Sequence, residues 1–132
     1  MERVERSALI ADPFADSPCG TRGTIKHITK TLWEPLRICT LGEDAIRAAQ
    51  VGFRDGLDLL IVNDRLRDVL YLDVIRRIKG LCGDCIAIFV IHSREANECE
   101  FQEERDLGVK QAFRTPYRSE LLETAICEAL KL

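Results

Sequence analysis

Short apolar segments recur along the chain at roughly regular intervals. The most apolar of them, residues 57–62 (LDLLIV), follows the turn-prone Asp55-Gly56 and ends at Asn63 and Asp64. A run this short and this rich in branched side chains is typical of a strand buried on both faces of a parallel sheet. Further apolar segments occupy residues 8–11, 37–41, 85–91 and 109–114. We expect each of these five segments to form a strand.

Segments with helical spacing lie between the predicted strands. Apolar residues recur at positions 25, 28, 32 and 36, and Pro35 predicts where this first helix ends. The other predicted helices cover residues 43–53, 70–81, 95–106 and the segment that begins at Ser119. The helix at 95–106 is acidic and weakly amphipathic, so we expect a solvated outer face, with a surface for a basic partner as the alternative.

The alternation of strands and helices predicts an α/β fold with a doubly wound, five-stranded parallel sheet, because parallel neighbours require right-handed helical crossovers. The flavodoxin-like (βα)5 arrangement, with strand order 2-1-3-4-5, fits this pattern. The 132 residues form a single domain in this interpretation, with a core from about residue 7 to 131. The predicted order brings Asp12, Asn63, Ser93 and Thr115 to one edge of the sheet, at the carboxyl ends of the strands.

Composition excludes several classes of function. The net charge of −3 provides no basic surface, so we expect no direct contact with nucleic acid. The apolar runs are far shorter than the ~20 residues that a membrane helix needs. The first residues, MERVER, lack the apolar core of a signal peptide, so we expect no membrane association and a cytoplasmic location.

Six cysteines are scattered through the chain at positions 19, 39, 82, 85, 99 and 127, and we expect most of them to be buried thiols. The exception is the CxxC motif formed by Cys82 and Cys85. Thioredoxin-like motifs follow a strand and open a helix, whereas this one precedes a strand, which argues against redox or metal chemistry. A thiol-redox sensor nevertheless stays as an alternative function.

Several short motifs together resemble the receiver domains of bacterial two-component response regulators. They are LIAD at 9–12, DLLIVN at 58–63, the position of Ser93, LGV at 107–109 and TP at 115–116. The resemblance covers nearly the whole chain, and the separations between positions 63, 93 and 115 agree with the family's acceptor-to-hydroxyl-to-lysine spacing. It implies a domain of phosphorelay signal transduction or transcription regulation that is not itself an enzyme.

The phosphorylation site that the resemblance implies is degenerate. The family has an acceptor aspartate where this chain has Asn63, a second acid where it has Pro13, and a lysine where it has Thr115. Asp12 and Ser93 match the family. Because an amide supplies neither a nucleophile nor a charge, we expect no catalytic residue, no resident cofactor and at best weak binding of Mg²⁺.

We therefore expect an atypical, phosphorylation-independent receiver that works as a protein-interaction module. By resemblance, it would bind a protein partner such as a histidine kinase, an output domain or a second copy of itself through the fourth helix, fifth strand and fifth helix. The residues on that face are Ala112, which replaces the family's aromatic residue, Phe113 and Tyr117.

The alternative is a working phosphoacceptor that uses Asp64, one position after Asn63. A bulge at the end of the strand would bring Asp64 to the pocket, and Asp68 lies further along the same loop. The alternation of side chains along a strand argues against this, because it directs neighbouring residues to opposite faces.

Overall fold

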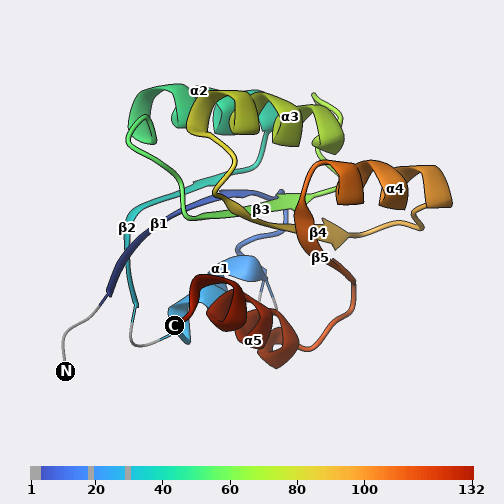
Figure 1. Ribbon diagram of the computed structural model, residues 1–132. Coiled ribbons are helices and arrows are strands. Elements are labelled where there is room, and N and C mark those ends of the chain that lie inside the picture. The colour runs from blue at the N-terminus through green and yellow to red at the C-terminus, as the bar shows by residue number, and fades with distance from the viewer. Residues whose placement is uncertain (1–3, 18–19, 29–30) are drawn as a thin grey trace.

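The computed structural model describes residues 4–17, 20–28 and 31–132. In these residues, strands and helices alternate along the whole chain (Figure 1). Their bounds are β1 Val4–Ala11, α1 Thr21–Lys26, β2 Thr31–Cys39, α2 Gly42–Gly52, β3 Leu59–Asn63, α3 Tyr71–Cys82, β4 Ala87–His92, α4 Glu98–Asp106, β5 Val109–Arg114 and α5 Ser119–Leu130. In the described part of the chain, no helix is long and apolar enough to cross a membrane.

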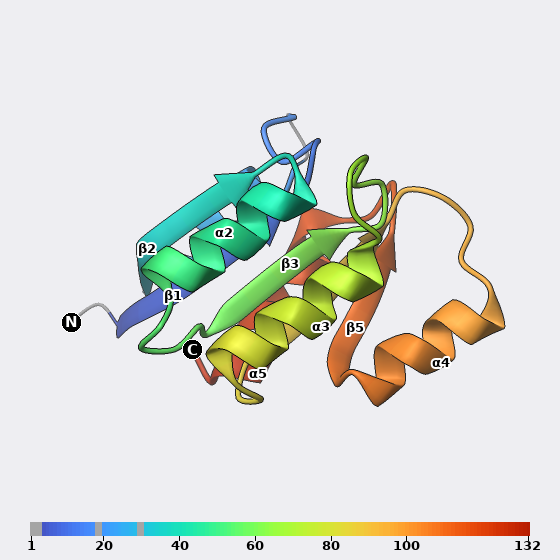
Figure 2. The same ribbon diagram turned by 90° about the horizontal axis from the view of Figure 1, so that it is seen from above.

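The strands form one parallel sheet in the order β2-β1-β3-β4-β5. Helices α2, α3 and α4 lie on one face of this sheet, and α1 and α5 lie on the other (Figures 1 and 2). The predicted fold class and strand order are confirmed. Every connection is a helical crossover, which is what parallel neighbours require.

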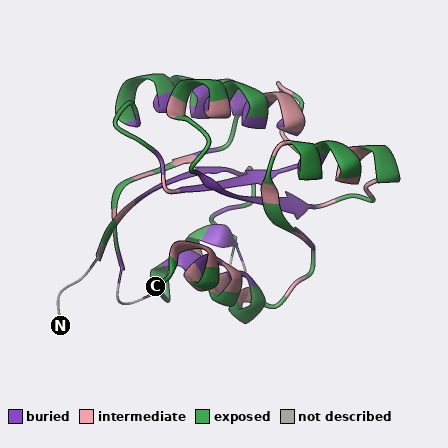
Figure 3. Cartoon of the chain, in the orientation of Figure 1, coloured by how far each residue is buried: buried purple, intermediate pink, exposed green. Residues whose placement is uncertain are grey.

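The sheet separates two apolar cores, and its central strands are buried on both faces (Figure 3). All five residues of β3 are buried, as the continuous apolar run predicted. Because side chains alternate along a strand, Leu60 and Val62 belong to the core under α2 and α3, while Leu59 and Ile61 belong to the core over α1 and α5.

The segment after α1 differs from the prediction. α1 ends at Lys26, and β2 runs from Thr31 through Pro35 to Cys39, where we expected a helix followed by a strand at 37–41. β1 is longer than expected, and Val4 at its start pairs with Thr31. Residues 32 and 36 therefore pair with β1 through their backbone groups, and this pairing overrides the helical spacing of their side chains. Pro35 is tolerated because β2 is an edge strand.

The loop after β3 is fixed by Asp68, which serves the start of α2. One carboxylate oxygen, Oδ1, accepts the Gly42 N–H at 2.8 Å, and the other, Oδ2, accepts the Glu43 N–H at 3.0 Å. Burial raises the pKa of the Asp68 carboxyl, but these N–H groups outweigh it and hold the pKa below the usual value. Asp68 is therefore engaged as a helix cap and ties the β3–α3 loop to α2.

Candidate functional site

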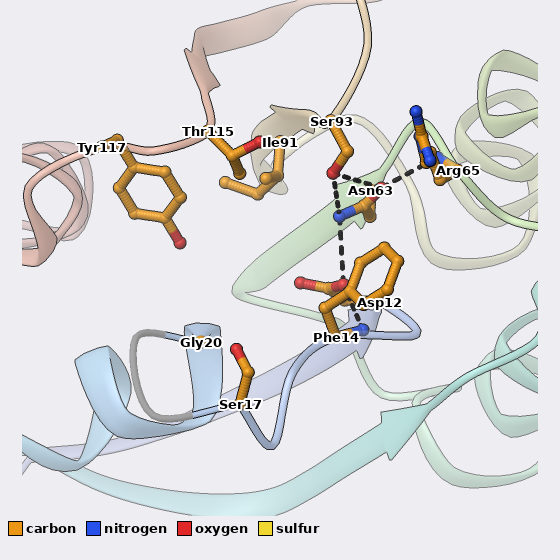
Figure 4. A pocket seen from close by; sticks show the side chains of 10 residues that line it. All are labelled: Asp12, Phe14, Ser17, Gly20, Asn63, Arg65, Ile91, Ser93, Thr115 and Tyr117. Carbon is orange, nitrogen blue, oxygen red and sulfur yellow. Dashed lines mark hydrogen bonds between the residues drawn. The ribbon is translucent and has the colours of Figure 1, made fainter.

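A cavity of about 370 Å³ lies at the carboxyl ends of the strands, where ligands of doubly wound sheets bind (Figure 4). The structure brings the four predicted pocket residues together in its lining: Asp12, Asn63, Ser93 and Thr115. They follow β1, β3, β4 and β5 respectively or end them. Neighbouring parallel strands end at the same edge, so residues 51 positions apart, such as Asp12 and Asn63, come into direct contact.

Asn63 is the centre of the pocket and is only 1% exposed. Its Nδ2 donates to Asp12 Oδ1 at 3.1 Å and to Ser93 Oγ at 3.0 Å. Its Oδ1 accepts the Arg65 N–H at 2.8 Å and lies 3.2 Å from the Ser93 hydroxyl (Figure 4). Both amide atoms are thus fully engaged with the protein, and the side that faces Asp12 is the donor side.

Asp12 is the pocket's carboxylate and is 3% exposed. Its Oδ1 also accepts the Phe14 N–H at 2.8 Å, and its Oδ2 accepts the Thr21 hydroxyl at 3.4 Å. Burial raises the pKa of Asp12, and the bonds from Phe14, Asn63 and Thr21 offset this only in part, so the pKa lies above its ordinary value.

The donor set of the pocket fits Mg²⁺ poorly. Mg²⁺ needs oxygen ligands in octahedral geometry, commonly including one or two carboxylates. Asp12 supplies one carboxylate, position 13 is a proline, and Asn63 turns its N–H₂ group toward Asp12 rather than an oxygen. Across the described ranges, no group of three or more His, Cys, Asp or Glu side chains is arranged to hold a metal ion.

Thr115 supplies no positive charge to the pocket. Its N–H donates to the His92 carbonyl at 2.9 Å, and its hydroxyl lies 3.4 Å from the same oxygen. The residue continues the pairing of β5 with β4 beyond the end of the strand. The cation that lines the cavity is instead Arg65, an exposed side chain after β3 that sequence reasoning did not single out.

The loop after β1 also lines the pocket, through Phe14, Ser17 and Gly20. The backbone of Ala15 approaches Gly20 so closely that a Cβ on Gly20 would lie 2.3 Å from the Ala15 carbonyl oxygen, so a glycine is required there. The segment is rich in Asp, Ser, Pro and Gly, a composition typical of loops, and Phe14, Ser17 and Gly20 close one side of the cavity.

Asp64, the predicted fallback acceptor, does not line this cavity. Its side chain is fully buried, Oδ1 accepts the Ser93 N–H at 2.8 Å, and Oδ2 lies 2.8 Å from His92 Nδ1. The backbone N–H of Asp64 still donates to the Ile91 carbonyl, so pairing with β4 continues and strand alternation directs the side chain away from the pocket.

A second polar cluster lies on that other side, and the sequence pattern did not reveal it. His92 Nε2 lies 2.8 Å from Glu104 Oε2, and the Tyr71 hydroxyl donates to the same oxygen at 2.7 Å. Burial lowers the pKa of His92, but the carboxylates of Asp64 and Glu104 outweigh it and raise the pKa to about 9. His92 is therefore a buried imidazolium at neutral pH.

The two cysteines of the CxxC motif lie away from the pocket, at the end of α3 and just before β4. Cys85 is exposed, while Cys82 is half-buried with its Sγ 4.0 Å from the Ala49 carbonyl oxygen. Burial raises the pKa of the Cys82 thiol. Reactive cysteines have lowered pKa values, so Cys82 lacks the thiolate character of a redox centre.

The three predicted interaction residues, Ala112, Phe113 and Tyr117, differ in how far they are exposed. Ala112 and Tyr117 are half-buried, and the Tyr117 ring lines the cavity (Figure 4). Phe113 is 5% exposed and packs near Phe89, with ring centroids 6.4 Å apart. We therefore correct the expectation that Phe113 belongs to a contact surface, because alternation along β5 directs its side chain into the core between the sheet and α5.

Comparison with known proteins agrees with this geometry at the level of fold. No protein-family model and no curated protein sequence matches the chain. Among solved structures, it is similar to a CheY-like response regulator receiver domain protein from Methanospirillum hungatei, with a TM-score of 0.79 and 16% identity over 96% of this chain and 94% of that one.

Two further structures show the same likeness. The signal receiver domain of a modulated diguanylate cyclase from Desulfovibrio desulfuricans has a TM-score of 0.75 and 19% identity, over 95% of this chain and 93% of that one. A Burkholderia pseudomallei response regulator, with a phosphorylated aspartic acid, calcium ion and citrate, has a TM-score of 0.71 and 17% identity, over 96% of this chain and 69% of that one. The chain therefore has the receiver-domain fold of response regulators, in a divergent sequence.

Proposed function

We propose that the chain is a response-regulator signalling domain that acts through protein contacts and does not depend on phosphorylation. The receiver fold supports the general class, since the matched structures are described as receiver domains and response regulators. The observation that carries the finer proposal is Asn63. Its amide stands at the acceptor position with both of its polar atoms engaged by Asp12, Ser93 and Arg65.

The chemistry of phosphoryl transfer supports this proposal. An acyl phosphate needs an anionic oxygen nucleophile and a divalent cation to neutralise the phosphoryl oxygens. The amide of Asn63 is neutral, and its N–H₂ group occupies Asp12 Oδ1. The position that carries a lysine in the family is Thr115, which contributes no fixed charge. Magnesium binding at this site is weak at best, and the domain is not an enzyme.

The two alternatives have less support. To act as a phosphoacceptor, the Asp64 side chain would have to break its hydrogen bonds with the Ser93 N–H and with His92, and then rotate to the opposite face of the sheet. A thiol sensor at Cys82 and Cys85 would start from a thiol whose pKa burial has raised. No observation favours either of them over a non-phosphorylated receiver.

The partner surface in this proposal is formed by α4, β5 and α5. It offers the half-buried Ala112 and Tyr117 and the exposed Leu121, which is 55% exposed on α5. A large apolar side chain exposed on a helix is a candidate anchor for a protein partner. The partner would be an output domain, a second copy of the chain or a histidine kinase, in a cytoplasmic pathway that includes transcription regulation.

The test is intact-mass spectrometry after incubation with acetyl phosphate and Mg²⁺. The mass should stay unchanged, and the sedimentation behaviour should be the same with and without the phosphodonor. An Asp64→Asn variant is treated in parallel, so that any adduct can be assigned. A base-labile adduct of one phosphoryl group that disappears in Asp64→Asn would overturn the proposal in favour of the working phosphoacceptor.

A further inference from the structure

Helix α4 attaches to the rest of the domain in an unusual way. A surface helix of a globular protein normally buries an apolar stripe against the core. α4, which the structure describes in full, buries one side chain, and it is the acid Glu104 at 3% exposure. The neighbouring Phe101 is half-buried, and Cys99 is exposed. Apolar burial alone therefore gives this helix little hold on the sheet.

A chain of charged contacts supplies that hold. Nδ1 of His92 is hydrogen-bonded to Asp64 Oδ2 at 2.8 Å. Nε2 of the same ring lies 2.8 Å from Glu104 Oε2, which is an ion-pair contact without hydrogen-bond geometry. The Tyr71 hydroxyl adds a bond to Glu104 at 2.7 Å, so α3 joins the cluster. The His92 ring is also edge-on to Phe101, with centroids 5.5 Å apart. One imidazolium thus links the residue after β3 and the last residue of β4 to Glu104, near the C-terminal end of α4.

His92 is the central cation of this cluster, because the two nearby arginines are paired with other acids. Arg94 is paired with Glu100 and lies 3.8 Å from Asp64, and Arg114 lies 3.7 Å from Glu95. Titratable or charged groups surround His92 from the residue after β3, from α3, the β4–α4 loop, α4 and β5. They are Asp64, Tyr71, Arg94, Glu95, Glu100, Glu104 and Arg114. Removing His92 would leave two buried carboxylates that share no cation between them.

We propose that Asp64, His92 and Glu104 form a latch that holds α4 in one position against the sheet. The latch thereby sets the α4 part of the interaction surface. It touches the degenerate pocket at one point, because Ser93 donates its N–H to Asp64 and its side chain contacts Asn63. The proposed function gives the latch a purpose, which is to keep the surface in one state without phosphorylation. The contacts themselves do not depend on that function.

Hydrogen exchange tests the latch in the full chain with His92→Gln. Local opening of a helix lowers the protection of its own amides and leaves distant elements unchanged. We expect the amides of α4 to lose at least tenfold in protection, with those of α2 and α5 within twofold of the unmodified protein. The matched control is His27→Gln, which changes the chain's other histidine, an exposed residue at the end of α1.

A double variant tests whether α4 loosens because of the unpaired charges or because the His92 side chain is lost. His92→Gln combined with Glu104→Gln removes the repulsion between the carboxylates, so it should recover part of the lost α4 protection. If His92→Gln does not fold, the latch can be tested in the unmodified protein by an NMR titration from pH 7 to 10. The α4 amide shifts should follow the titration of the His92 ring and be independent of His27.

Unchanged α4 protection in His92→Gln, or α4 shifts that do not follow the His92 ring, would overturn the latch. These outcomes are distinct from a failure of the proposed function. Phosphoryl uptake with an intact latch would overturn only the proposed function, whereas an absent latch with no phosphoryl uptake would overturn only this inference.

Discussion

Replacing Asn63 by Asp tests whether the pocket is one substitution away from a phosphoacceptor. The amide nitrogen that donates to Asp12 Oδ1 over 3.1 Å becomes an oxygen, so a hydrogen bond becomes a contact between two carboxylates. Asn63 is 1% exposed and Asp12 is 3% exposed, so water screens this contact poorly. The substitution therefore places a carboxylate at position 63 and introduces a buried like-charge pair.

Coulomb's law gives the size of the effect. Two unit charges at this separation repel by about 5 kcal/mol at an effective dielectric constant of ~20 and by about 1 kcal/mol in bulk water. The pair can relieve the repulsion by sharing a proton, as neighbouring carboxyl groups do. We expect Asn63→Asp to lower the free energy of unfolding by roughly 2–4 kcal/mol at neutral pH.

The pH dependence has a definite sign. Repulsion raises the pKa of the pair in the folded state above the value of about 4 in the unfolded chain. The folded variant then binds more protons than the unfolded chain, so its deficit in stability is small below about pH 4 and grows as the pH rises through the raised pKa. Urea unfolding at several pH values between 4 and 8 measures this deficit against the unmodified protein.

The matched control is Asn97→Asp, because Asn63 and Asn97 are the two asparagines of the chain. Asn97 caps α4 and accepts the Glu100 N–H through its side-chain oxygen at 2.9 Å. An aspartate caps a helix about as well, so this control should stay within about 0.5 kcal/mol of the unmodified protein. Equal stabilities of Asn63→Asp and the unmodified protein at pH 7 would refute the buried contact with Asp12.

Phosphoryl uptake completes the test. Asn63→Asp alone should take up almost no phosphate from acetyl phosphate, because Mg²⁺ would meet only the new carboxylate and Asp12, and none of the described residues that line the cavity is a lysine. Adding Pro13→Asp and Thr115→Lys should raise Mg²⁺ affinity and uptake together, in a non-additive way. A single variant that reacts nearly as fast as the triple variant would show that Pro13 and Thr115 do not limit the pocket.

Three further outcomes are expected. Asp68→Ala should lower the free energy of unfolding by about 1–2 kcal/mol in urea titrations, because α2 loses two N-terminal hydrogen bonds. A disulfide between Cys82 and Cys85 should leave the amide spectrum at Asn63 unchanged, and shifts there would favour the thiol sensor. The pKa of His92 is raised to about 9 in the folded protein, so the charged ring contributes fully to stability below about pH 6.5, and this contribution is lost as the pH rises toward 9. The loss is on the order of 3 kcal/mol. Urea titrations of His92→Gln should not show it.

The amino-acid sequence alone determined the class of fold and the position of the pocket. Continuous apolar runs such as 57–62 identify strands buried on two faces, and their alternation with helical segments permits few topologies other than a doubly wound parallel sheet. Since the carboxyl ends of such strands meet at one edge, the sequence alone predicts that Asp12, Asn63, Ser93 and Thr115 lie together. The strand order and this grouping agree with the structure.

The spacing of apolar residues gave wrong predictions where pairing between distant strands determined the structure. The apolar residues at 32 and 36 have helical spacing, yet they lie in β2 because β1 extends to Val4 and offers a partner strand. Phe113 was expected on a surface, but the register of β5 with β4 places it in the core. Spacing along the chain carries no information about which distant backbone groups are available for pairing.

The tertiary structure alone decided the direction and the partners of the polar side chains. Asp64 is one residue from Asn63, and the strand's alternation turns it away from the pocket toward His92. Glu104 lies in an acidic helix with no periodic sign of burial, and it is buried because His92 offers a cation from a strand end 12 residues earlier. A buried charge is stable only beside its counter-charge, and that juxtaposition exists only once the sheet and α4 have come together.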